Sequence, residues 1–286
     1  MKVYYECGAC FLRQAREAMN LVTDDNDLKI DLMKDILNFL AKNYKKGASS
    51  NKIGSAMHRI IKDKTNCEDP YTNEKIMGNK IAMEFLPKIK SLLKEDDSLE
   101  NYIKIAIVGN ILDFGALGLN FDPQEFIMSN LDKDLSVNNI DLLKEAINNN
   151  AKVLYLADNT GEIVFDKLLI EKLNEMGLEV TVALKEKPIL NDACLEDAVA
   201  IDLDKIANLT TLGTDSVGII HEEASDDFKK LFDSSDFIIA KGLGNYEGLT
   251  EIDLEGKDAF SLLCAKCSAI AKDIGVEEKD NVLLKL

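Results

Sequence analysis

The 286-residue chain contains no tryptophan, only four prolines and only two histidines. So few prolines argue against a long, turn-rich all-β architecture. No stretch approaches the ~18 consecutive apolar residues of a membrane-spanning helix. The first residues also lack the apolar segment of a signal peptide. We therefore expect a cytoplasmic protein without a membrane partner.

Basic residues are also scarce relative to acidic ones. The chain has 34 Lys and Arg against 51 Asp and Glu, which gives a formal net charge of −17. Such an acidic surface argues against binding to nucleic acid or anionic membranes, since both require a basic face. It still leaves room for a small basic pocket that binds an anionic metabolite. Hydrophobic residues make up 46% of the chain, which is enough to build a core.

The spacing of apolar residues changes near residue 150. Before it the spacing is mostly helical, after a capping region at residues 24–27, and Pro87 marks a kink or a boundary. After it, short apolar runs alternate with helical stretches, which predicts a mostly parallel sheet covered by helices. We therefore expect a helical domain over 1–148 and an α/β domain over 149–286. The expected strands are 153–157, 180–184, 209–212, 237–240 and 260–263, with a last edge strand at 282–284.

Polar residues follow the five expected parallel strands. The carboxyl ends of such strands meet at one edge of the sheet, where ligands bind, so this pattern predicts a site. A purely structural reading also exists, in which the Asp and Asn residues only cap helices. The residues after the strands are Asp158, Asn159, Gly161, Glu162 and Asp166; Lys185, Asn191 and Asp192; Gly213, Thr214 and Asp215; Lys241, Gly242, Gly244 and Asn245; and Lys266 and Cys267.

The residue types at this edge suit metal-assisted phosphoryl chemistry. Asp158, Asn159 and Asp192 offer hard oxygen ligands for Mg²⁺ or Mn²⁺, ions that complete their shell with water and phosphate. Gly161 precedes an expected helix whose first amides can hold an anion. Lys241 adds a cation beside a loop that a ligand can approach closely.

Seven short segments, in this order along nearly the whole chain, resemble the domain of unknown function 89 family, the metal-dependent damage-control phosphatases. The resemblance is to the prokaryotic and archaeal type with an N-terminal CxxC. Leu243 and Ala193 depart from the pattern, which often has Gln and Thr there; the first departure bears on a substrate contact and not on the metal site. The segments are Cys7–Cys10 with Gln14, Glu68–Tyr71, Gly109–Gly115, Asp158–Glu162 with Asp166, Lys187–Asp192, Ala240–Glu247 and Ala265–Cys267.

The resemblance implies an N-terminal helical part and a C-terminal Rossmann-like α/β/α sandwich. It also implies a phosphatase that hydrolyses phosphomonoesters of small metabolites, either sugar phosphates or damaged phospho-metabolites. A divalent ion (Mn, Co, Ni or Mg) is expected on Asp158, Asn159 and Asp192, with phosphate on Lys241. These four residues form the expected catalytic set. The remaining expected substrate contacts are Asp69, Asn110, Gly161, Glu162, Gly242 and Asn245.

Several alternatives stay open at this stage. The attacking group is either a water molecule or Asp158, which would form an aspartyl phosphate. An S-adenosylmethionine-dependent carboxyl methyltransferase is one alternative function, because Rossmann-like sheets also bind adenosyl cofactors. However, no glycine-rich loop follows the first expected strand. A non-catalytic protein that binds a metal or a metabolite is the other alternative.

The six cysteines are too few for a disulfide scaffold. Cys7 with Cys10 and Cys264 with Cys267 form two CxxC pairs at opposite ends of the chain. Such pairs are compatible with a zinc site, a redox pair or buried packing residues. The sequence leaves their role open, and it leaves the oligomeric state open as well.

Overall fold

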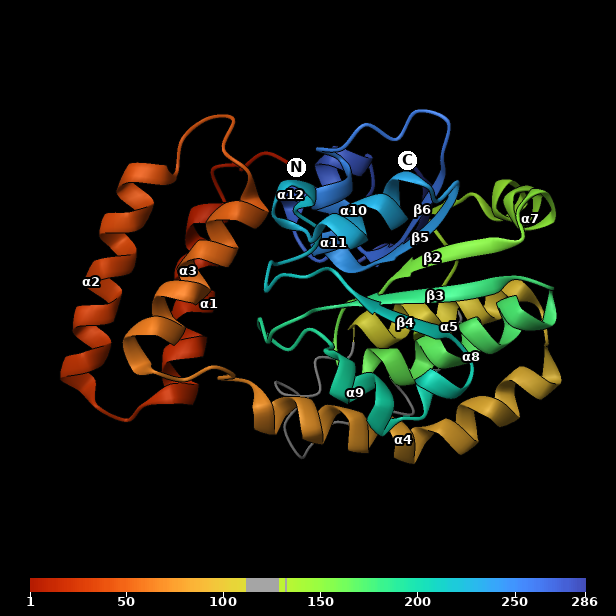
Figure 1. The fold of residues 1–286 in the computed structure, drawn as a ribbon, viewed down its shortest axis with the longest axis horizontal. Helices are drawn as coiled ribbons and strands as arrows, with labels where there is room; N and C mark the ends of the chain where they lie inside the picture. Colours follow the sequence, from red (N-terminus) through yellow and green to blue (C-terminus); the bar gives the residue numbers. More distant parts are fainter. Residues whose placement is uncertain (112–128, 132) are drawn as a thin grey trace.

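The structure is a computed structural model that describes residues 1–111, 129–131 and 133–286. Within these residues, seven strands form one sheet in the order β1-β7-β6-β5-β2-β3-β4 (Figure 1). All neighbouring pairs are parallel except β6 and β7. The expected mostly parallel α/β sheet is confirmed. The strands are β1 (Val137–Asn138), β2 (Lys152–Leu156), β3 (Glu179–Leu184), β4 (Asn208–Thr211), β5 (Phe237–Lys241), β6 (Asp258–Cys264) and β7 (Asn281–Lys285).

The position of one strand in the sheet differs from the prediction. The segment at 282–284 was expected at the edge of the sheet, but β7 lies second from the edge because β1 pairs outside it. β1 falls within the segment that we expected to be helical. A strand of only two residues has no alternating pattern that could reveal it in the sequence.

Helices lie on both faces of the sheet, as the burial of four consecutive residues in β2 requires. Leu154 and Leu156 pack on the side of α10 and α11, whereas Val153 and Tyr155 pack on the side of α5 and α8. The helices are α1 (Cys7–Val22), α2 (Asn26–Asn43), α3 (Ser50–Thr65), α4 (Thr72–Glu95), α5 (Leu99–Ile111), α7 (Ile140–Asn149), α8 (Glu162–Glu175), α9 (Leu195–Ala200), α10 (Asp226–Asp233), α11 (Gly242–Leu249) and α12 (Ser268–Ile274).

Local sequence signals explain features of two helices. Asp25 caps α2 as expected, because its side chain accepts the N–H groups of Asp27 and Leu28. Pro87 was expected at a kink or a boundary; it marks no boundary, because it lies inside α4, and this helix is bent along its length in Figure 1. Pro87 and Met83, whose carbonyl would otherwise accept its missing N–H, both lie on the exposed face of α4. Water is therefore available to that carbonyl.

The N-terminal helices divide into two groups by the core that they share. Helices α1–α3, here called the helical arm, have a core of their own that includes Phe11, Leu32, Ile36 and Met57. Helices α4, α5 and α7 instead contribute to the core of the sheet. The packing thus groups α4, α5 and α7 with the sheet, and the expected domain boundary at residue 148 stays a prediction. Helix α5 joins the sheet because it is apolar on almost every side and must be enclosed.

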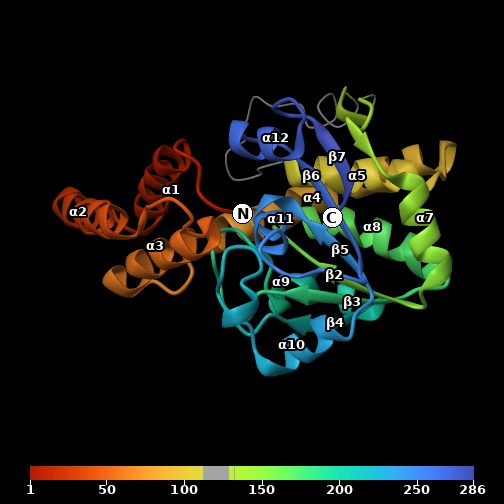
Figure 2. The same cartoon turned by 90° about the horizontal axis from the view of Figure 1, so that it is seen from above.

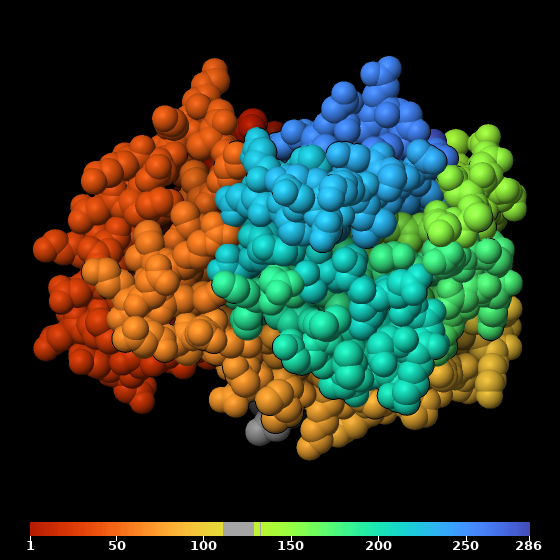
Figure 3. Space-filling model, viewed as in Figure 1, coloured from red at the N-terminus to blue at the C-terminus, as the bar shows by residue number. Residues whose placement is uncertain are grey.

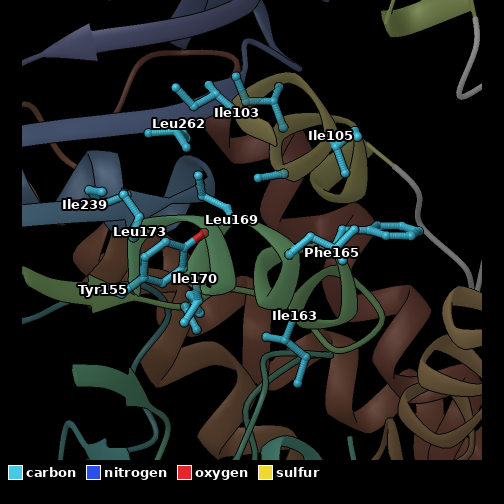
Figure 4. Packing of buried hydrophobic residues seen from close by; sticks show 14 of the residues in the cluster. Ile103, Ile105, Tyr155, Ile163, Phe165, Leu169, Ile170, Leu173, Ile239 and Leu262 are labelled. Atoms are coloured by element: carbon cyan, nitrogen blue, oxygen red, sulfur yellow. The ribbon is translucent and has the colours of Figure 1, made fainter. Parts of the chain in front are cut away.

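Figure 4 shows this enclosure, in which Ile103 of α5 lies near Leu262 of β6 and close to the side chains of α8. Gly109 allows the close approach, since a Cβ atom there would lie 2.7 Å from the Phe165 ring. Seen from above, the helical arm projects from one side of the α/β body (Figure 2). In the space-filling view the orange side chains of the arm meet the cyan side chains of the body (Figure 3).

Candidate active site

The candidate site lies where the strand order reverses. β3 and β4 follow β2 on one side, and β5 then pairs with β2 on the other side. A ligand of a doubly wound sheet binds at such a reversal, beside the carboxyl ends of the two central strands. Asp158 and Asn159 come directly after β2, and Gly242 comes directly after β5. A Cβ atom at Gly242 would overlap Asp158 Oδ2, so only glycine fits there.

The loop after β3 brings the third expected metal ligand to the same place. Asn159 and Asp192 face each other in an isolated antiparallel bridge. The N–H of Ala193 donates to the Asp158 carbonyl at 2.8 Å, which closes the two loops on each other. Asp158 is 9% exposed and Asp192 is 3% exposed. The structure therefore brings Asp158, Asn159 and Asp192 together in a nearly buried position.

Asn110, from the last turn of α5, joins this group. Its Nδ2 donates to Asp158 Oδ2 at 2.8 Å and to Glu162 Oε2 at 2.7 Å. Asn159 Nδ2 donates to the same two oxygens, at 2.9 and 3.1 Å. Two asparagine amides therefore bridge the carboxylates of Asp158 and Glu162. Of the segment Gly109–Gly115, residues 112–115 lie outside the described residues.

The ammonium of Lys241 is buried inside the protein and binds protein groups of α5 and α8. Its ammonium donates to Glu162 Oε1 at 2.5 Å, to Asp166 Oδ1 at 2.6 Å and to the Ala106 carbonyl at 2.8 Å. The side chain is fully buried. All three ammonium hydrogens are thus engaged within the protein, which leaves none for the phosphate contact that we expected.

The buried ionisable groups at the site are mostly acidic. Four buried carboxyl groups, those of Asp158, Glu162, Asp166 and Asp192, outnumber the two buried lysines beside them, which are Lys185 and Lys241. Burial raises the pKa of Asp158 well above its ordinary value, and the charges of Glu162 and Asp192 raise it further. Burial also raises the pKa of Asp192 to about 6, although Lys185 opposes this change. A divalent cation would favour the charged forms of these carboxyl groups.

The donor atoms also fit a hard divalent ion. Asn110 Oδ1 is buried and accepts no hydrogen bond from the described residues, whereas Asp192 Oδ2 is buried and lies 3.4 Å from the Lys185 ammonium. The three expected ligands comprise two carboxylates and one amide, a set that suits Mg²⁺ or Mn²⁺ when water and phosphate complete the shell. In the described part of the chain, no three His, Cys, Asp or Glu side chains are arranged to hold a metal ion. The proposed set differs from such a trio because it includes an asparagine.

Two residues at the site had not been assigned a role from the sequence. Lys266 follows β6; its ammonium donates to the Asn110 carbonyl, and its charge counteracts the raised pKa of Asp158. Its position after a parallel strand was the available signal. Asn79 of α4 accepts the Gly161 N–H at 2.6 Å, so this amide is already engaged in the protein. Nothing in the sequence indicates a contact between residues so far apart.

The other expected substrate contacts have structural partners. Asp69 accepts the Tyr71 N–H at 3.0 Å and lies 3.4 Å from the Lys75 ammonium. Lys75 in turn pairs with Asp197 at 2.8 Å. Asn245 Nδ2 donates to the Lys241 carbonyl at 2.9 Å and to the carbonyl of the residue before Asp158 at 3.0 Å. Asn245 therefore ties the start of α11 to the end of β2.

The cysteines do not form a metal centre in the described residues. Cys264 lies in the core of the sheet, whereas Cys267 lies at the start of α12 among a different set of apolar side chains. Burial raises the pKa of Cys7, Cys264 and Cys267. All six cysteines are free thiols. The helices of the described residues include none with the length and hydropathy of a membrane span.

The fold and the site together define a doubly wound α/β protein with a polar ligand site at the strand-order reversal. The model of the damage-control phosphatase ARMT1-like domain matches residues 3–282. The chain therefore belongs to this family, and the family expected from the seven segments is confirmed.

Individual relatives cover the full length of the chain. The chain is 41% identical to an uncharacterized protein of Methanocaldococcus jannaschii, over 100% of this chain and 96% of that protein. It is 35% identical to a protein of Archaeoglobus fulgidus named damage-control phosphatase, over 99% of this chain and 98% of that protein. A crystal structure of a DUF89 family protein from Pyrococcus horikoshii matches with a TM-score of 0.90 and 33% identity, over 100% and 99% of the two chains.

Proposed function

We propose that the protein is a metal-dependent phosphatase that hydrolyses phosphomonoesters of small metabolites, such as sugar phosphates or damaged forms of them. One observation carries the proposal: a cluster of buried carboxyl groups that outnumber the buried lysines lies at the strand-order reversal, beside an exposed lysine. The names of two relatives as damage-control phosphatases support it. The excess of acidic over basic residues also favours a small substrate over nucleic acid.

Asp158, Asn159 and Asp192 would hold the metal ion (Mn²⁺, Co²⁺, Ni²⁺ or Mg²⁺). When bound, such an ion polarises the phosphoryl group and makes a bound water more acidic. The chain prepares this site, because Asn110 and Asn159 both donate to Oδ2 of Asp158. The other carboxylate oxygen, Oδ1, would then be available to the metal ion. Either attack by water or attack by Asp158 itself is compatible with this arrangement.

We assign the contact with phosphate to Lys266 and not to Lys241. Lys266 is exposed, and its ammonium already reaches the Asn110 carbonyl at the edge of the site. A flexible exposed lysine can turn toward a phosphate oxygen and neutralise its charge in the transition state. Lys241 instead holds the Glu162 carboxylate in place through Oε1, while Oε2 of Glu162 accepts hydrogen bonds from both asparagines.

Metal-free protein, prepared with a chelator, tests the proposal. Phosphate release is measured from p-nitrophenyl phosphate and from a panel of sugar phosphates, each with Mg²⁺, Mn²⁺, Co²⁺ or Ni²⁺. The expected result is metal-dependent release that Asp158→Ala abolishes. Asp227→Ala, which removes a carboxylate that is 95% exposed on α10, serves as the matched control and retains the activity.

The same experiment addresses the other two functions. A folded protein that binds metal and sugar phosphates but releases no phosphate would contradict the proposal and favour a non-catalytic binding protein. Thermal stabilisation by S-adenosylmethionine, without any by metal, would favour a methyltransferase. The loop after β2 carries Asp158 and Asn159 where a glycine-rich loop would be expected for that cofactor.

A further inference from the structure

His58 is a buried polar residue that the proposed chemistry does not use. It lies on α3 of the helical arm and is 2% exposed. Its Nε2 is buried and has no hydrogen-bond partner among the described residues. Buried polar atoms are rarely left without a partner, because an unpaired one costs free energy. An unpaired nitrogen in this position therefore calls for a partner that binds there.

The contacts of α3 show which side of the helix His58 lies on. Asn51 donates to the Gly244 carbonyl at 2.9 Å, Ser55 accepts the Val217 N–H at 2.8 Å, and Lys62 donates to the Pro188 carbonyl at 2.7 Å. These three residues form one stripe along α3, at spacings of four and seven. His58 falls in the same stripe, three residues after Ser55 and four before Lys62.

The partners of this stripe belong to the loops at the carboxyl edge of the sheet. Pro188 follows β3, Val217 follows β4 and Gly244 follows β5. The same loops carry Asp192 and Gly242 of the candidate site. His58 therefore faces the edge of the sheet at which the phosphate is expected, from the opposite side of the interface between arm and body.

The state of the imidazole indicates what kind of group it binds. Burial lowers the pKa of His58 to about 4, and the charge of Lys62 lowers it further, so the ring is neutral at ordinary pH. A neutral imidazole has one nitrogen that donates and one that accepts. A hydroxyl group can serve as partner in either case, since it both donates and accepts. A phosphate dianion requires a donor and would favour a charged ring.

We propose that His58 is a specificity-determining residue whose Nε2 forms a hydrogen bond with a hydroxyl of the substrate, in the part that is not phosphate. The inference rests on the proposed function and adds to it a residue that recognises the hydroxyl groups of the substrate. Tyr71 packs against His58 with ring centroids 6.5 Å apart. Tyr71 follows the turn at Asp69, so α3 and the start of α4 together border this part of the site.

The test compares two classes of substrate in the metal-loaded enzyme. Sugar phosphates carry hydroxyls, whereas p-nitrophenyl phosphate carries none beyond its phosphate. In His58→Leu, which keeps the side-chain volume but removes the polar atoms, we expect KM for the preferred sugar phosphate to rise on the order of tenfold. We expect KM for p-nitrophenyl phosphate to change less than twofold. His58→Gln, which restores a polar atom, is expected to recover most of the loss.

Two controls make the result decisive. His221→Leu changes the other histidine of the chain, which lies beside Asp233 in a different cavity, and should alter neither KM. The melting temperature of His58→Leu should equal or exceed that of the wild type, because the substitution removes an unpaired buried nitrogen. Equal changes of KM for both substrates, or an unchanged KM for sugar phosphates, would overturn the inference while leaving the phosphatase intact. Absence of any hydrolysis by the wild-type protein would overturn both proposals.

Discussion

Gly242 and Asp158 are fitted so closely that a Cβ atom on residue 242 would overlap Asp158 Oδ2 and lie 3.0 Å from Asn110 Nδ2. Gly242 also has φ +76°, in the left-handed region. The contact joins the loop after β5 to the loop after β2, across the line where the strand order reverses. The position of the carboxylate therefore depends on the absence of a side chain on the neighbouring strand.

We expect Gly242→Ala to weaken metal binding at least tenfold, because the new methyl group must displace Asp158. Gly256→Ala is the matched control: Gly256 has φ +79°, and no atom of the described residues lies within 4 Å of a Cβ there. Both variants pay a backbone cost of about 1 kcal/mol, so only the first should lose metal affinity. Isothermal titration with Mn²⁺ measures the difference. Equal affinities in the two variants would contradict the role of the contact.

A second prediction separates the two lysines. Lys241→Met leaves Glu162 and Asp166 without their buried cation, which should lower the free energy of unfolding by about 3–5 kcal/mol. Lys266→Met removes an exposed charge and should change this free energy by less than about 0.5 kcal/mol, while it raises KM for every phosphomonoester. Urea denaturation and steady-state kinetics measure the two effects. A stable, inactive Lys241→Met beside a fully active Lys266→Met would restore Lys241 as the phosphate ligand.

His58 should make the stability of the protein depend on pH in a defined window. Its pKa of about 4 in the folded protein lies below the ordinary value of 6.5. Between these two values the unfolded chain binds a proton that the folded protein does not, so the folded state loses stability as the pH falls from 6.5 to 4. The loss due to His58 is about 3 kcal/mol. His58→Leu should lack it, as urea denaturation of both proteins at pH 7 and pH 4.5 would show. If both proteins lost the same stability between pH 7 and pH 4.5, His58 would be more exposed to solvent than it is in the structure.

Asp215 connects the helical arm to the body at two points. It accepts from Arg59 Nε at 2.8 Å and from Lys62 Nζ at 3.0 Å, and these contacts lower its pKa despite burial. Asp215→Asn should cost about 1 kcal/mol or less but speed amide hydrogen exchange in α3. Asp35→Asn, which breaks the pair with Lys64 inside the arm, is the control. Unchanged exchange in α3 would mean that the apolar contacts alone hold the arm.

The parts of the fold that could be predicted are those with a local signal. Four of the expected parallel strands contain short apolar runs, and these runs mark where β2, β3, β5 and β6 lie because most residues of these strands are buried. β4 lies at the edge of the sheet and is only partly buried, so its signal is weaker. β1 has two residues and no such signal. The residues after each strand could be placed at one edge because parallel strands end together. The contacts of Lys241 with Ala106, Glu162 and Asp166 could not be predicted, because they depend on how α5 and α8 pack around its central strand.

Contacts between segments that are distant in the sequence could not be predicted from the sequence. Asn79 contacts Gly161 through the packing of α4 on α8, which depends on the tertiary fold and not on either local sequence. The same holds for the arm: the spacing of apolar residues predicts helices in both α3 and α4, but it does not show which core each helix joins. The grouping of α4 with the sheet became visible only from the packing.

The parallel pairing of β2 with β5 has a consequence for how the protein folds. Leu156 pairs with Ala240, although β3 and β4 lie between them in the chain. Closing so long a loop is entropically costly, so this pairing forms late relative to the local helices of the arm. The ligand site requires the loops after both β2 and β5, so we expect it to form only after the transition state of folding. A ligand bound there would therefore slow unfolding while it leaves the refolding rate unchanged.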